Sequence, residues 1–88
     1  MAIAYPVTVS TTNQVARPAK SRTFLGVYNQ SAGTIYIALD TPAVNAATAG
    51  QFTIAAGASI TWGPGDPQAV PSGAINMIGA AGPATIVE

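Results

Sequence analysis

The 88-residue sequence contains neither cysteine nor histidine. Without cysteine there is no disulfide framework, no thiolate nucleophile and no cysteine-based zinc site. Without histidine there is no side chain whose ordinary pKa lies near neutrality. Charge is scarce as well, since three Lys or Arg residues balance three Asp or Glu residues and only 7% of the chain is charged. The composition therefore gives no global attraction to nucleic acid or to an anionic membrane.

Leucine is also nearly absent, with two residues, whereas valine and isoleucine contribute 15 and threonine ten. These β-branched side chains are restricted at χ1 and suit the pleated surface of a sheet better than a helix. Nine glycines and seven prolines interrupt the chain at short intervals. High hydrophobicity with little charge is the opposite of a disordered composition. The sequence therefore predicts an all-β protein.

A membrane-spanning helix would have to lie in one of the long stretches without charged residues. The segment between Asp66 and Glu88 is long enough to cross a bilayer, but it contains Pro67, Pro71 and Pro83. Proline removes backbone donors, and a helix interrupted in this way would leave carbonyl groups unsatisfied in lipid. We expect no transmembrane span, and the first residues lack the basic region of a signal peptide.

Alternating or continuous apolar runs predict about seven short strands separated by turns. Their approximate ranges are 3–9, 24–28, 34–39, 51–54, 58–62, 74–78 and 84–88. Pro6 favours an edge position for the first strand, and the run 24–28, apolar on both faces, favours a central one. Short separations predict that 24–28 pairs with 34–39, and 51–54 with 58–62, as antiparallel hairpins. Regularly spaced short strands are typical of a compact antiparallel β-sandwich or a small barrel.

We expect a single β domain over 1–88, in which 1–14 form an N-terminal edge strand and linker, 15–23 a basic arm and 24–88 the β core. Residues 43–50 are predicted to form a surface loop, and 63–67 a flexible excursion. A domain of this size leaves much of its surface exposed, and six charged side chains are few to cover it. An uncharged surface with open strand edges favours association, so we expect a homo-oligomer or a subunit bound to a larger protein surface.

Catalytic chemistry has few candidates. The side-chain carboxylates are Asp40, Asp66 and Glu88, and the first two lie in Asp-Thr-Pro and Gly-Asp-Pro contexts that are typical of turns. No serine has a histidine or lysine partner at a recognisable spacing, and no cluster of oxygen ligands suits calcium. We therefore predict a non-enzymatic protein without a metal or another cofactor.

Two groups of side chains are candidates for binding a partner. Arg17, Lys20 and Arg22 are the only cations and lie within six residues. They form either a patch that contacts an acidic partner, or three solvated charges that pair with the protein's own carboxylates. Nucleic acid is the weaker possibility, because phosphate binding usually recruits more cations. Trp62 borders the 63–67 segment and is the candidate for sugar stacking, although aromatic residues on strands more often pack in the core.

A series of short motifs resembles small virion proteins of tailed bacteriophages, of the head decoration (cement) type or the capsid-binding parts of head fibres. In chain order these motifs are an Arg before an apolar strand (Arg22), "YNQS" at 28–31, "IYIAL" at 35–39, an "AAG" turn at 55–57, "PSGAI" at 71–75 and "TIVE" at 85–88. The resemblance covers about residues 15 to 88. The family pattern has a glycine after "IYIAL", where this chain has Asp40.

The resemblance implies a trimeric all-β module that binds the major capsid protein at symmetry axes of an icosahedral shell, on the surface of the virion. The alternative is a carbohydrate-binding or host-receptor-binding module of a tail, baseplate or head fibre, with Trp62 in the sugar site. We further predict that residues 15–22 dock onto a neighbouring subunit or capsid protein through Arg17 and Arg22. Arg22 precedes an apolar strand, so its pairing with Glu88 or Asp40 is the competing prediction.

Overall fold

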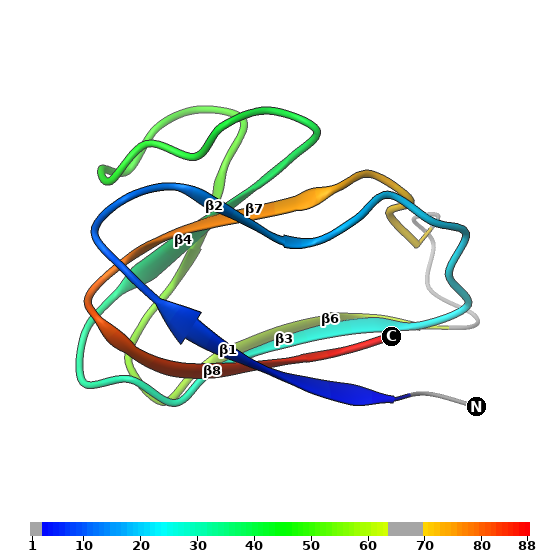
Figure 1. Ribbon diagram of the computed structural model, residues 1–88, viewed down its shortest axis with the longest axis horizontal. Helices are drawn as coiled ribbons and strands as arrows, with labels where there is room; N and C mark the ends of the chain where they lie inside the picture. The colour runs from blue at the N-terminus through cyan, green and yellow to red at the C-terminus, as the bar shows by residue number, and fades with distance from the viewer. Residues whose placement is uncertain (1–2, 64–69) are drawn as a thin grey trace.

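The computed structural model describes residues 3–63 and 70–88, which form two four-stranded antiparallel sheets stacked as a sandwich (Figure 1). The first sheet has the order β1 (Ala4–Val9), β8 (Gly82–Val87), β3 (Leu25–Asn29), β6 (Ser59–Trp62). The second has the order β2 (Gln14–Arg17), β7 (Ile75–Gly79), β4 (Ile35–Leu39), β5 (Phe52–Ile54). The predicted β-sandwich is confirmed, with eight strands where the sequence predicted about seven. No helix in the described ranges is long and apolar enough to cross a membrane.

The core lies between the two sheets and is made mostly of branched aliphatic side chains. Val27 and Ile86 enter it from the first sheet, and Ile35, Ile37 and Met77 from the second, all without exposed surface. Burying such a side chain contributes about 1.5–3 kcal/mol, so the β-branched residues both favour the strands and stabilise the contact between sheets. The predicted central position of 24–28 is confirmed, since β3 lies between β8 and β6.

The predicted pairing of 24–28 with 34–39 is wrong, because β3 and β4 belong to different sheets. The connection from β3 to β4 therefore passes from the first sheet to the second, and it is held by the side chain of Asn29, which is 1% exposed. Its Nδ2 donates to the carbonyl oxygens of Gly33 at 2.8 Å and Ile54 at 2.9 Å, and its Oδ1 accepts from the Ser31 hydroxyl at 2.6 Å. These bonds fix an arch in place of a hairpin turn.

The predicted pairing of 51–54 with 58–62 is wrong for the same reason. β5 pairs with β4 in the second sheet, whereas β6 pairs with β3 in the first. Asn29 also joins this second arch, since its backbone N–H donates to Ala58 O at 2.9 Å and its carbonyl accepts from Gly57 N at 3.0 Å. Asn29 of the "YNQS" motif therefore forms hydrogen bonds with two connections that pass between the sheets, the one from β3 to β4 and the one from β5 to β6.

The N-terminal region contains an extra strand. Among the strands of the described residues, β1 pairs only with β8, which confirms the predicted edge position of the first strand. β2 pairs with β7 from Gln14 opposite Met77, with an irregularity between Val15 and Arg17. The first part of the predicted basic arm, 15–17, is therefore an edge strand of the second sheet, and only 18–23 form a connection.

A third crossing, from β7 to β8, depends on a glycine. Gly79 has a φ of 155°, and a Cβ added there would lie 2.6 Å from the carbonyl oxygen of Thr34. Any larger residue would force the start of β4 away from the end of β7. Because L-residues rarely adopt this conformation, the crossing requires glycine.

Candidate functional site

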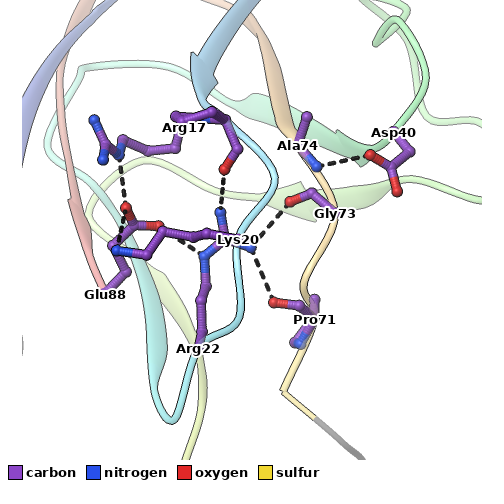
Figure 2. Close-up of polar contacts among 9 residues, drawn as sticks. Arg17, Lys20, Arg22, Asp40, Pro71, Gly73, Ala74 and Glu88 are labelled. Atoms are coloured by element: carbon purple, nitrogen blue, oxygen red, sulfur yellow. Dashed lines mark hydrogen bonds and ion pairs between the residues drawn. The ribbon is translucent and has the colours of Figure 1, made fainter.

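Four of the six charged side chains meet at one end of the sandwich, and we call Arg17, Lys20, Arg22 and Glu88 the Glu88 cluster (Figure 2). Glu88 directly follows β8, Arg17 is the last residue of β2, and Lys20 and Arg22 lie in the connection from β2 to β3. β8 belongs to the first sheet and β2 to the second. The cluster therefore joins the two sheets through charged side chains.

Arg22 and Glu88 form the centre of the Glu88 cluster. Arg22 Nε donates to Glu88 Oε2 at 2.7 Å, and neither side chain has exposed surface. The terminal nitrogens of Arg22 donate to three backbone carbonyl oxygens at 2.8–3.0 Å, those of Pro18, Pro71 and Gly73. A buried charge is tolerated when it is paired and hydrogen-bonded, and Arg22 is paired with Glu88 and has a hydrogen bond from each of its three nitrogens.

Arg17 and Lys20 form the outer part of the cluster. Arg17 Nε donates to Glu88 Oε1 at 2.8 Å, and its guanidinium carbon lies 3.7 Å from the centroid of the Tyr5 ring. Lys20 Nζ lies 3.7 Å from the same Oε1, while its backbone N–H donates to Ser72 O at 2.9 Å. The Arg17 side chain is 23% exposed and that of Lys20 45%. These two cations therefore face solvent above a buried ion pair.

The carboxyl group of Glu88 is held in its ionised form. Burial alone raises its pKa, but the hydrogen bonds from Arg22 and Arg17 and the positive charges of both outweigh burial, so the pKa lies below its ordinary value. Glu88 is therefore an anion at neutral pH, and a lowered pKa makes it unsuited to act as a general acid there.

This geometry revises the predicted docking role of the cations. Arg22 has no exposed surface with which to contact a partner, and the competing prediction that it pairs internally with Glu88 agrees with the structure. Removal of Arg17 and Arg22 together would remove both hydrogen bonds to Glu88, so that double variant would lose stability as well as charge. Partner binding stays a prediction, now for Arg17 and Lys20.

Asp40 has a local structural role at the end of β4. Its φ is 60°, in the left-handed region where glycine is favoured and Asp or Asn is tolerated. Its Oδ1 accepts the N–H of Ala74 at 2.8 Å, and its own N–H donates to Ala74 O at 2.9 Å. The turn predicted at Asp40 is thus built on a pair of bonds to the neighbouring connection. Asp66, and the predicted excursion beyond Gly63, lie outside the described residues.

Trp62, the candidate for sugar stacking, takes the alternative position and packs in the core. Trp62 is only 6% exposed and belongs to the core. Its ring packs edge-to-face on Phe52, with the ring centroids 5.2 Å apart and an angle of 83° between the planes. This aromatic pair joins β6 of one sheet to β5 of the other, so the side chain stabilises the sandwich and is not available to a ligand.

The remaining surface of the described residues carries little charge and has open strand edges. Within each sheet the outer strands, β1 and β6 in the first and β2 and β5 in the second, have a strand neighbour on one side only. Three large apolar side chains are more than half exposed, namely Ile3, Val15 and Val44. Unpaired strand edges can pair with a strand of another chain.

No group of three or more potential metal ligands occurs within 3–63 and 70–88. Comparison with protein-family models, with curated proteins and with solved structures finds no match for this chain. The resemblance to phage virion proteins therefore stays a prediction, and a functional proposal depends on the geometry of the chain itself.

Proposed function

We propose that this chain is a non-enzymatic structural protein of a tailed bacteriophage, a decoration or cement protein that binds the assembled capsid and stabilises it. The observation that carries the proposal is the distribution of charge. Four of the six charged side chains gather in the Glu88 cluster, and Asp40 is bonded within a turn. The rest of the described surface is an uncharged β-sandwich with four open edges. A surface of this kind suits extended contact with protein better than chemistry on a small molecule.

The size of the chain explains how such a protein would act. A standard interface buries about 800 Å² per partner, which is a large share of the 4604 Å² that this chain exposes. One copy therefore has room for few contacts. Many copies on a shell reach high total affinity through multivalency, because each further contact within one assembly is intramolecular. We propose a homotrimer as the unit that contacts neighbouring capsomers.

The two sheets of the sandwich are internally hydrogen-bonded and are joined to each other at one end. Backbone hydrogen bonds connect β8 to β1 and β3 in the first sheet, and β7 to β2 and β4 in the second. The Glu88 cluster joins the two sheets. In a shell under internal pressure, a rigid module that links neighbouring capsomers resists their separation. Rigidity also lowers the entropy lost on binding.

The proposal is tested by co-sedimentation with particles assembled from the major capsid protein of the same phage. We expect the chain to sediment with assembled shells and to bind dissociated capsid protein much more weakly, since the shell alone presents several contacts at once. Equal binding to shells and to free subunits would contradict the multivalent mechanism. A failure to sediment with shells at saturating concentration would contradict the proposed function.

The oligomeric state is tested separately by analytical ultracentrifugation of the isolated chain. We expect a trimer, or a larger assembly, at micromolar concentration, because open edges and exposed apolar residues favour association. A monomer of 8.8 kDa throughout that range would contradict the proposed trimer without deciding whether capsids are bound.

A further inference from the structure

The side chains of the Glu88 cluster carry more positive than negative charge. One side-chain carboxylate faces three cations: Oε2 of Glu88 is bonded to Arg22, and Oε1 is bonded to Arg17. Lys20 lies 3.7 Å from Oε1, beyond ideal hydrogen-bond length. Among these side chains, three positive charges therefore meet one negative charge, in a molecule whose other described surface is nearly free of charged side chains.

The excess charge lies on the outer two cations. Arg22 is neutralised by Glu88 and has all of its nitrogens engaged, three of its bonds going to backbone carbonyl groups. Arg17, in contrast, donates to Glu88 through Nε, and within the described part of the chain no hydrogen bond from its two terminal nitrogens is found. Those nitrogens and the ammonium group of Lys20 are the donors that a bound anion would meet.

Of the two donors, the guanidinium group of Arg17 is held in place before any ligand arrives, whereas for Lys20 only the backbone is fixed. The guanidinium group of Arg17 lies over the Tyr5 ring and is tied to Glu88, which restricts its rotation. The backbone of Lys20 is fixed by its bond to Ser72. A guanidinium edge matches the two oxygens of a carboxylate, and a neighbouring ammonium adds a second charge.

We propose that Arg17 and Lys20 form a binding site for a carboxylate group in an acidic segment of a partner protein. This proposal deepens the proposed function and rests on it for the identity of the partner as a capsid protein. It predicts that the contacted surface of that partner carries Asp or Glu side chains. The carboxylate would complete the balance of charge that Glu88 provides only in part.

Charge distinguishes this partner from nucleic acid. Proteins that bind the phosphate backbone use many cations, and their affinity depends steeply on salt because many counterions are released. Here two exposed cations occur in a chain of zero net charge and a pI of about 6.0. Two cations suit one or two carboxylates at a protein interface.

The site is tested with two synthetic decapeptides, one rich in glutamate and the other with glutamine at the same positions. Binding is followed by NMR through the side-chain N–H of Arg17 and the backbone N–H of Lys20. We expect the glutamate peptide to shift both signals and the glutamine peptide to leave them unchanged. Salt at about 0.5 M should suppress the shifts, because exposed charges are then screened beyond a few ångströms.

Lys20→Gln is the informative variant, because Lys20 is the most exposed member of the cluster and its removal leaves the Arg22–Glu88 pair intact. We expect it to weaken binding of the glutamate peptide by about two- to fivefold, the range for one exposed charge pair. Lys20→Arg keeps the charge and should bind as the original chain does. Equal binding of both peptides, or unchanged binding by Lys20→Gln, would overturn the proposal.

A short DNA duplex provides the remaining comparison. Tighter binding of the duplex than of the glutamate peptide at equal salt would overturn the assignment to a carboxylate partner. Capsid co-sedimentation then separates the two proposals. If Lys20→Gln binds shells like the original chain, the site proposal fails and the proposed function stands. If the peptide binds but shells do not, the proposed function fails alone.

Discussion

Replacing Glu88 with glutamine removes the one negative charge of the Glu88 cluster while keeping the shape of the side chain. Arg22 would remain buried without a counter-ion. The glutamine amide has one oxygen and one NH2 group, so at most one of the Nε–H groups of Arg17 and Arg22 would keep an oxygen acceptor. Breaking one side of a buried ion pair costs about 3–5 kcal/mol. Arg17 and Lys20 are partly solvated, and glutamine retains one acceptor. We therefore expect a loss of about 2–4 kcal/mol in the free energy of unfolding.

For a domain of 88 residues, this loss corresponds to a decrease in melting temperature of roughly 10–20 °C. Thermal unfolding followed by circular dichroism at pH 7 measures it. Lys20→Gln is the matched control, because it removes a charge from the same cluster at a side chain that is 45% exposed. Its effect should be below about 1 kcal/mol. Equal melting temperatures for Glu88→Gln and the control would refute the claim that the buried Arg22–Glu88 pair stabilises the fold.

The same carboxylate predicts a pH dependence. The pKa of Glu88 in the folded chain is lowered, since the bonds and charges of Arg22 and Arg17 outweigh the effect of burial. The unfolded chain therefore takes up the proton first as the pH falls. The stabilisation is present above about pH 4.5 and is lost as the pH falls through the lower, folded-state pKa. Glu88→Gln should lose this component of the acid transition, and an unchanged pH profile would show that the component does not come from Glu88.

Three further predictions concern other parts of the molecule. Asn29→Asp should destabilise the fold by at least about 3 kcal/mol, because a buried carboxylate would face the carbonyl oxygens that now accept from Nδ2. Chemical denaturation measures this loss, and wild-type stability would refute the role of the Asn29 side chain in holding the connection. Gly79→Ala should lower the denaturation midpoint, since its Cβ would lie 2.6 Å from Thr34 O. Gly57→Ala is the control: Gly57 also has a positive φ but has open space around it, so this substitution measures the cost of backbone strain alone. Melting in excess chelator should match melting without it, and a large decrease would reveal a metal requirement.

The positions of the strands are largely predictable from the sequence, but their pairing is not. Val, Ile and Thr in short runs between glycines and prolines determine where most strands lie. β3 and β4 are buried on most of their positions, so alternation does not reveal which sheet each belongs to. A five-residue connection such as 30–34 fits a hairpin and an arch equally well. The deciding feature is the side chain of Asn29, whose acceptors near residue 54 are distant in sequence.

The candidate site is predictable in its composition and not in its geometry. The three cations stand out in a chain with six charges, and Glu88 is among their possible partners. Whether Arg22 is solvated or buried depends on β2 and β8 ending at the same end of the sandwich. No pattern predicts β2, because Gln14–Arg17 is only four residues long and its two apolar residues are adjacent instead of alternating. Trp62 precedes a segment rich in glycine and proline, which suggests an accessible ring, whereas the ring points into the core.

Binding to an assembled capsid can be seen by electron cryo-microscopy of shells incubated with the chain, compared with bare shells. We expect additional density on the outer surface at symmetry axes, in which three copies of the sandwich contact neighbouring capsomers with Arg17 and Lys20 near acidic residues. Shells without added density at saturating concentration, or density confined to a tail or baseplate, would contradict the proposed function.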